Sequence, residues 1–290
     1  MTSTQQKEFL MANRDKLEKT HDRLMRAVAS ITSGEDWRRM LDVAGRFHTY
    51  SPGNVFLVLA QRPDATRVAG FNTWRKLGRQ VKAGEHGIAI LAPCLYRAHR
   101  GDGEVAEDAE ESRALRGFRV VHVFDLEQTV GQPLEEVAPV SLAGDAPAEL
   151  WERLAAQVAA AGFHLLRGDC RPANATTHFH SRAVVVGTHL SPAQACKSLC
   201  HELAHVRLHD GGEYARGCRG VTEVEAESVA YLVCSAAGLP TEEYTFPYVA
   251  LWAGGDVKMV RQTSARVIGC AREILRESGL GSADGGCPES

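Results

Sequence analysis

The pentapeptide HELAH at residues 201–205 constrains this chain more than any other feature of its sequence. On a helix, His201 and His205 lie one turn apart, so both imidazoles project from one face and can bind the same metal ion. The motif therefore requires a packed helix, which residues 191–192 (Ser-Pro) can begin as N-cap and first helical position. Glu202 stands beside the coordination position that remains open. We predict a zinc site on this helix, with Glu202 as the catalytic residue.

A second predicted helix, residues 222–237, supplies the third ligand. It follows a glycine-rich turn and carries three closely spaced carboxylates. Glu223 and Glu227 are four residues apart and share a helix face, whereas Glu225 points about 200° away from Glu223. We predict that Glu223 binds zinc and that Glu227 accepts a hydrogen bond from the ring N–H of a ligand histidine. Metal binding by Glu227 or another residue in place of Glu223 is the alternative.

Four other side chains near the motif are weaker candidates. His209 lies too far along the helix axis to complete a tetrahedron with the other two histidines, and we expect it in the core or at its rim. Cys200 faces away from the predicted site, while a Cys218 ligand would indicate a different class of zinc hydrolase. Tyr231 could donate to an oxyanion, but an aromatic at that spacing more often packs in the core.

The predicted ligand set determines the chemistry of the site. Two histidines and one carboxylate leave a fourth position for water, whose pKa falls toward neutrality on zinc. Glu202 would take the proton of this water and pass it to the leaving amine of a hydrolysed amide. The prediction is a zinc metalloendopeptidase that acts on a protein or peptide substrate. A helix that holds no metal is the alternative.

The remaining sequence indicates an α+β protein of two domains. Apolar spacing predicts helices in the first 60 residues, and two strands follow on either side of residues 101–111, which we interpret as a solvated hairpin tip. A segment rich in Pro and Gly then suggests a boundary. We predict an α+β domain at residues 1–130, a linker at 131–147 and a mainly helical domain at 148–290.

Charge and targeting features narrow the partners and the compartment. The first 100 residues hold 17 Lys and Arg against 9 Asp and Glu, although the whole chain has a net charge of −3. This asymmetry predicts an anionic partner for the N-terminal part. The chain begins without a signal-peptide pattern, has no apolar run of membrane-spanning length, and scatters its eight cysteines without CxxC pairs. We therefore expect a cytoplasmic protein without membrane segments or disulfides.

Several motifs resemble known families. HELAH at 201–205 together with EVEAESVA at 223–230 resembles the metallopeptidases of the ImmA/IrrE group. The N-terminal part is similar to the single-stranded-DNA-binding domain of ArdC antirestriction proteins, and the resemblance to an ArdC-like protein covers about residues 10–275. The N-terminal motifs are YSPGN at 50–54, VAGFNTW at 68–74, LGRQVKAGEHGI at 77–88 and VFDLEQT at 123–129.

The resemblance implies a domain that binds single-stranded DNA followed by a zincin-like metallopeptidase domain, with a link to plasmids and evasion of restriction. It also implies zinc on His201, His205 and Glu223. The chain departs from the family patterns at Thr222, where ArdC has a first Glu, and at Glu227, where ImmA/IrrE proteins often have Asn. Neither change removes a ligand.

Basic side chains beside aromatic ones suit single-stranded DNA, because cations neutralise phosphates and aromatics stack on unpaired bases. The opposing interpretation is that the aromatics, at helical spacing, belong to the core. The predicted DNA contacts are Phe71, Trp74, Arg75, Lys76, Arg79 and Lys82.

Three functions are compatible with these sequence features. The first is a DNA-associated zinc metallopeptidase. The second is a DNA-binding protein that protects DNA by occlusion and whose zinc site is not catalytic. The third is a regulator of the ImmA/IrrE type that cleaves a repressor and uses its N-terminal domain for protein contacts. An acidic DNA mimic is disfavoured because the first 100 residues are basic.

Overall fold

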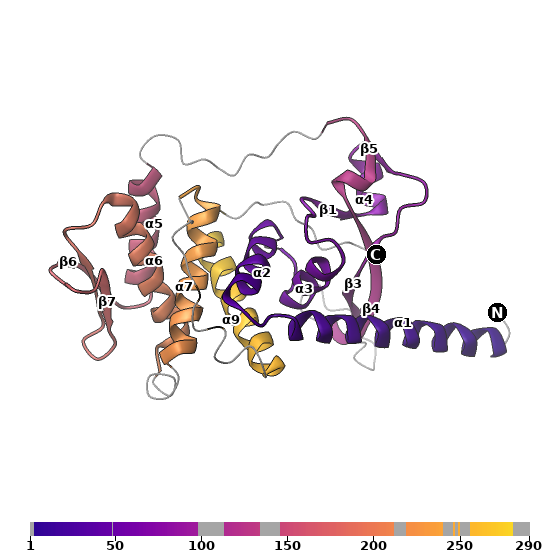
Figure 1. Ribbon diagram of the computed structural model, residues 1–290, viewed down its shortest axis with the longest axis horizontal. Coiled ribbons are helices and arrows are strands. Elements are labelled where there is room, and N and C mark those ends of the chain that lie inside the picture. Colours follow the sequence, from indigo (N-terminus) through magenta and orange to yellow (C-terminus); the bar gives the residue numbers. More distant parts are fainter. Residues whose placement is uncertain are drawn as a thin grey trace, which may run out of the picture. The chain divides into compact units, whose positions relative to one another are not determined.

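Helices and strands both contribute to the chain, and they group into two units of packing in this computed structural model (Figure 1). The predicted α+β class with two domains is confirmed, and the C-terminal part is mostly helical. Unit 1 comprises residues 1–27, 56–132 and 288–290, and unit 2 comprises residues 28–55 and 133–287. The structure describes residues 3–47, 49–97, 113–133, 146–211, 219–239, 246, 249 and 256–280.

Unit 1 is built on an antiparallel sheet in the order β1-β4-β3, with a separate two-stranded ladder of β2 and β5. The two strands predicted around the hairpin are β3 and β4, while the predicted tip at 101–111 lies outside the described residues. The elements are α1 (Ser3–Ala29), the end of α3 (Pro52–Gln61), β1 (Val68–Gly70), α4 (Phe71–Lys76), β2 (Arg79–Val81), β3 (Ile88–Arg97), β4 (Arg113–Asp125), η1 (Leu126–Gln128) and β5 (Thr129–Gly131).

Two buried side chains hold the end of β4 in unit 1. Asp125, which is fully buried, accepts hydrogen bonds from the backbone N–H groups of Thr66 and Arg67. The Trp74 ring is also fully buried, and its Nε1–H donates to the backbone carbonyl of Phe124 at 2.8 Å. Since buried polar groups are costly without partners, these contacts fix both α4 and the segment before β1 against the end of β4.

Unit 2 packs helices on one face of a three-stranded sheet in the order β6-β8-β7. β6 runs parallel to β8, and β7 pairs with β8 in the antiparallel sense at the end of the sheet. Figure 1 shows α6 and α7 side by side in this unit. Its elements are α2 (Gly34–Arg46), α5 (Ala146–Ala160), β6 (His164–Gly168), β7 (Ala175–His178), β8 (Ala183–Gly187), α6 (Pro192–His209), α7 (Arg219–Ala236) and α9 (Val257–Glu277).

An N-terminal segment completes the core of unit 2. Trp37 of α2 is fully buried, and its Nε1–H donates to Oγ of the buried Ser228 on α7 at 2.8 Å. The predicted boundaries placed all of residues 1–130 in one domain, whereas packing assigns residues 28–55 to the unit that holds the HELAH helix. The difference arises because contacts between distant parts of the chain are not visible in local composition. Of the predicted linker, residues 134–145 lie outside the described part.

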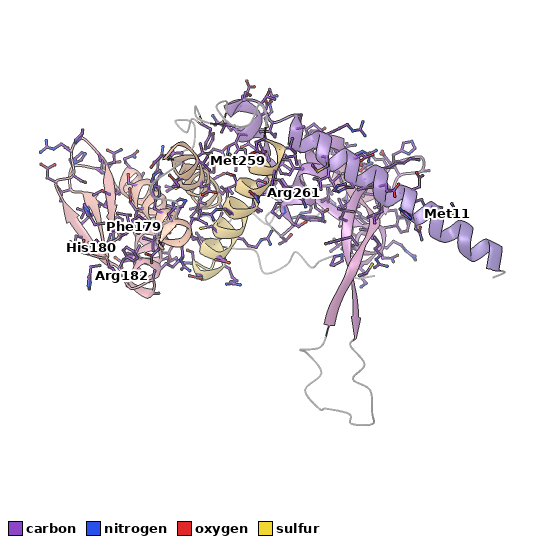
Figure 2. The ribbon with its side chains drawn as sticks, turned by 90° about the horizontal axis from the view of Figure 1, so that it is seen from below. Met11, Phe179, His180, Arg182, Met259 and Arg261 are labelled. Carbon is purple, nitrogen blue, oxygen red and sulfur yellow. The ribbon has the colours of Figure 1, made fainter. Side chains whose placement is uncertain are left out.

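The turn between β7 and β8 anchors the end strand of this sheet. Figure 2 labels Phe179, His180 and Arg182 in this turn. The Arg182 guanidinium lies 4.1 Å from the centre of the Phe163 ring and pairs with Asp210, directly after α6, at 3.0 Å. These contacts tie β7 to the same region of the unit as the C-terminal end of α6.

The six cysteines that the structure describes are free thiols, while Cys218 and Cys287 lie outside the described residues. Within the described part of the chain, no helix combines the length and the apolar character that crossing a membrane demands.

Candidate metal centre

Helix α6 carries both predicted histidine ligands on one face. It begins as predicted, because the Ser191 side chain caps its first turn. Leu199 and Leu203 are fully buried and pack the helix into unit 2. His201 and His205 keep 20% and 14% of their side-chain surface exposed. The helix is therefore fixed by its apolar residues while the imidazole pair stays within reach of a ligand.

Helix α7 brings Glu223 to these two histidines. Nε2 of His201 lies 3.1 Å from Nε2 of His205, and the Glu223 oxygens lie 3.4 Å and 3.7 Å from these two nitrogens. The three donor atoms all lie within 4.8 Å of one another, and among the described residues no other His, Cys, Asp or Glu cluster does so. Two imidazoles and a carboxylate suit Zn²⁺ and also accommodate other divalent ions.

His201 and Glu223 form an ion pair within this donor set. Burial disfavours the charged imidazolium, but hydrogen bonds to Glu223 and Glu227 outweigh burial and raise the pKa of His201 to about 9. Hydrogen bonds from His201 and then His205 hold the pKa of Glu223 well below its usual range. A metal ion that binds here at neutral pH must therefore displace a proton from His201.

Glu202 is held by a strand that sequence reasoning did not predict. Its side chain is buried, and Oγ1 of Thr177 on β7 donates a hydrogen bond to Glu202 Oε2 at 2.6 Å. Thr177 pairs with the buried Val184 of β8, so both side chains point to the helix-covered face of the sheet. The contact fixes one carboxylate oxygen of Glu202 and thereby orients the other.

Glu227 lies against His201 in the geometry that its predicted role requires. Glu227 Oε2 is 3.0 Å from His201 Nδ1, the ring nitrogen that does not face His205. The Lys197 ammonium lies 3.8 Å from the other oxygen of Glu227. A carboxylate in this position accepts the ring N–H and so favours Nε2 as the metal-binding atom.

Sequence reasoning missed a second group of contacts, which ends on His205. His209 was expected in the core or at its rim, and it is buried, but its Nδ1 lies 2.9 Å from Nδ1 of His205. The opposite nitrogen, Nε2, lies 2.9 Å from Oε2 of the buried Glu225, which Arg266 of α9 binds at 2.8 Å. The four-residue spacing from His205 to His209 was visible, whereas the Arg266 partner depends on tertiary packing.

The remaining candidates lie away from the donor set. The Tyr231 hydroxyl donates to Asp42 of α2, and its ring stacks under Arg38, so Tyr231 packs as expected. Cys200 is fully buried, and its hydrogen bond with Cys234, followed by burial, raises the pKa of its thiol. A thiol of that kind is a poor source of a thiolate ligand.

The predicted DNA contacts divide into exposed, buried and engaged side chains. Phe71, Arg75 and Lys76 are exposed on α4. Trp74 is a correction, because its fully buried ring belongs to the core and cannot stack on a base. The other two cations already form hydrogen bonds within unit 1. The Arg79 guanidinium donates to the Thr129 side chain and to the backbone carbonyls of Thr129, Gly131 and Gln132, and Lys82 Nζ donates to the carbonyl of Glu127.

Two segments of the chain match known family models. Residues 14–124 match the family model of the N-terminal domain of anti-restriction factor ArdC. Residues 157–245 match the IrrE N-terminal-like domain, a peptidase family. The first match includes residues 28–55, so the family domain and the packing unit differ in this segment.

Relatives with similar sequence or structure are distant. An uncharacterized protein of Bacillus anthracis, pXO2-81, is 24% identical over 92% of this chain, and the chain spans about half (52%) of its length. The metal-free crystal structure of antirestriction protein ArdC from plasmid R388 is 18% identical, with a TM-score of 0.51 over 79% of this chain and 85% of that one. Its Mn(II)-bound structure is 19% identical, with a TM-score of 0.49 over 84% and 99%.

Proposed function

Because this chain is an ArdC-like protein that carries both the ArdC N-terminal domain and the IrrE N-terminal-like domain, we propose that it is a DNA-associated zinc metalloendopeptidase with a role in antirestriction or mobile-element biology. One observation carries the peptidase part of the proposal. His201, His205 and Glu223 converge within 4.8 Å from two helices, and the buried Glu202, which follows His201 on α6, interacts electrostatically with that histidine. The match of residues 14–124 to the N-terminal domain of anti-restriction factor ArdC supports the antirestriction part.

The proposed reaction is hydrolysis of a peptide bond. Zinc held by the three ligands would supply a Lewis acid that acidifies water and polarises the scissile carbonyl. Glu202 takes a proton from the attacking water and transfers it to the leaving amine, while Thr177 keeps its carboxylate oriented. Strand β7, which carries Thr177, is an edge strand of its sheet in the described part of the chain. The backbone N–H and C=O groups on its outer side can therefore align an extended peptide beside the site.

Metal dependence of hydrolysis tests the peptidase proposal. We expect the wild type to bind one zinc ion per chain and to cleave peptides in a proteome-derived library, read out as new termini by mass spectrometry. His201→Ala is expected to lose both the metal and the cleavage, because it removes a ligand. The control is His164→Ala, since His164 is exposed on β6 and should leave both properties unchanged. Cleavage that persists in His201→Ala or after chelation would refute the proposal.

Single-stranded DNA is the proposed partner of unit 1. Phe71 and Arg75 are four residues apart on α4, so the 49%-exposed ring and the exposed cation lie on one helix face. Lys76 follows directly and is also exposed. An aromatic surface bordered by cations fits unpaired bases and their phosphates.

Charge removal on α4 tests the DNA-binding part. The double variant Arg75→Gln/Lys76→Gln is expected to weaken binding of a fluorescent oligonucleotide and to reduce the salt slope of log K by about 0.7 for each phosphate that is no longer neutralised. The matched control is Lys258→Gln/Arg261→Gln, which removes the same charge from exposed positions of α9 in unit 2. Equal weakening by the two double variants would contradict a DNA site on α4.

The two experiments together separate the three functions. Metal binding and DNA binding without cleavage would favour protection of DNA by occlusion. Cleavage without binding to any oligonucleotide at low salt would favour a repressor-cleaving regulator of the ImmA/IrrE type. Both activities in one chain are expected for a DNA-associated peptidase.

A further inference from the structure

Three side chains outside the donor set connect a proposed metal ligand to helix α9. His205 contacts His209, His209 contacts Glu225, and Glu225 contacts Arg266, at 2.9, 2.9 and 2.8 Å. We propose that His209, Glu225 and Arg266 are positioning residues that orient His205 and fix the position of its ring proton. The inference rests on the proposed metal site and extends it to residues that bind no metal themselves.

The direction of the hydrogen bonds follows from the position of the metal ligands. Nε2 of His205 faces His201 and Glu223, so it is the nitrogen available to the metal. The ring proton of His205 must then be on Nδ1, which donates to Nδ1 of His209. His209 in turn carries its proton on Nε2 and donates it to Glu225. Each imidazole therefore has one assigned tautomer, and the Glu225 charge acts on His205 through a neutral ring.

Because His209 and Glu225 are buried, each of their polar groups needs a hydrogen-bond or ion-pair partner. His209 is 5% exposed and Glu225 is 1% exposed, so the Glu225 charge needs a partner. Arg266 supplies it through Nε at 2.8 Å and through its terminal nitrogen at 3.3 Å. The same terminal nitrogen donates to the carbonyl of Leu208 at 2.9 Å, next to His209 in the last turn of α6. Arg266 thus holds both the carboxylate and the backbone that presents His209.

The two proposed histidine ligands interact with their supporting carboxylates in different ways. His201 contacts the Glu227 carboxylate directly, and the Glu227 side chain is 26% exposed. His205 reaches its carboxylate through His209, and that carboxylate is almost completely buried. Water can replace a missing partner more easily beside His201 than beside His205, so substitutions in the buried group should have the clearer effect on the metal.

A matched pair of substitutions at His209 tests the proposal. Asn can place its side-chain oxygen where His209 has Nδ1, whereas Leu has nearly the same shape and no acceptor. We expect His209→Leu to raise the zinc dissociation constant about 10- to 100-fold, His209→Asn to raise it less, and Glu225→Gln to weaken binding as well. Affinity is measured by competition with a chromophoric chelator, with thermal unfolding of the metal-free proteins as a folding control.

Nitrogen chemical shifts of the imidazoles in the zinc-loaded protein give a second readout, since they report which ring atom carries the proton. The expected result is a proton on Nδ1 of His205 and on Nε2 of His209. A third variant, Glu277→Gln, is the control, because it removes the carboxylate of another arginine ion pair, that of Arg207, in unit 2. Its zinc affinity should equal that of the wild type.

The outcomes distinguish failure of this inference from failure of the proposed function. Equal zinc affinity in His209→Leu and His209→Asn, or the opposite tautomers, would overturn the positioning role while the metal site stands. A wild type that binds no zinc would overturn the metal site and the positioning role together. Loss of hydrolysis alone, with the affinity series as expected, would overturn only the peptidase reaction.

Discussion

Replacing Glu202 with Gln is expected to lower peptide hydrolysis by about 10²- to 10⁴-fold and to leave the metal bound. Gln has the shape of Glu and can still accept the hydrogen bond from Thr177, but it cannot take a proton from water. Since Glu202 is not among the three converging donors, the zinc content should stay at the wild-type level. The measurement is kcat/KM on the best peptide of the library, together with metal analysis of the same sample.

The control for Glu202→Gln is Glu152→Gln, which neutralises an exposed carboxylate on α5 of the same unit. Its kcat/KM should match the wild type. Undiminished hydrolysis by Glu202→Gln would eliminate Glu202 as the general base. Biological protection that survives the substitution, with hydrolysis abolished, would instead favour the occlusion function, because that function requires binding alone.

The core of the candidate site could be predicted because it depends on spacing along helices. A spacing of four residues places two side chains on the same face of a helix before any tertiary structure is known. This spacing separates His201 from His205 and Glu223 from Glu227. The structure brings the donor set and Glu227 together in this geometry. The roles of these residues in metal binding and catalysis remain predictions for the experiments above.

The supporting contacts could not be predicted, because each joins separate elements. Thr177 lies on a four-residue strand of mixed polarity, which carries too weak a period-2 signal to be recognised, and it reaches Glu202 only after β7 pairs with β8. Arg266 is 41 residues beyond Glu225. Glu225 was set aside because it points away from Glu223, yet that direction leads to His209.

Helical spacing also could not separate core from surface in α4 and its C-cap residue, Leu77. Phe71, Trp74 and Leu77 have the same apolar period, but Trp74 is buried while Phe71 and Leu77 are 49% and 48% exposed. A helix of six residues has too few positions for its pattern to define a buried face. The exposed Phe71 and Leu77 are consistent with a ligand surface. Sequence periodicity alone would assign both residues to the core.

Replacing Trp37 with Ala is expected to destabilise the unit that holds the metal site by about 3–5 kcal/mol. The indole is fully buried, and its removal leaves a cavity and takes away the hydrogen bond to Ser228, the neighbour of Glu227 on α7. Trp37, a residue from the N-terminal part of the chain, therefore lies in the core of unit 2. The measurement is the denaturant midpoint for zinc release, which reports on unit 2, beside the midpoint for loss of oligonucleotide binding, which reports on unit 1.

Trp74→Ala is the matched control, because Trp74 is equally buried and also donates its Nε1–H, but to Phe124 within unit 1. If packing defines the folding units, Trp37→Ala lowers mainly the midpoint for zinc release and Trp74→Ala mainly the midpoint for DNA binding. Equal shifts of the DNA-binding midpoint in both variants, with zinc release unchanged, would show that residues 28–55 fold with residues 56–130 as one N-terminal domain. A fragment that starts at residue 148 would then suffice for the metal site, whereas the packing of Trp37 against Ser228 requires α2 as well.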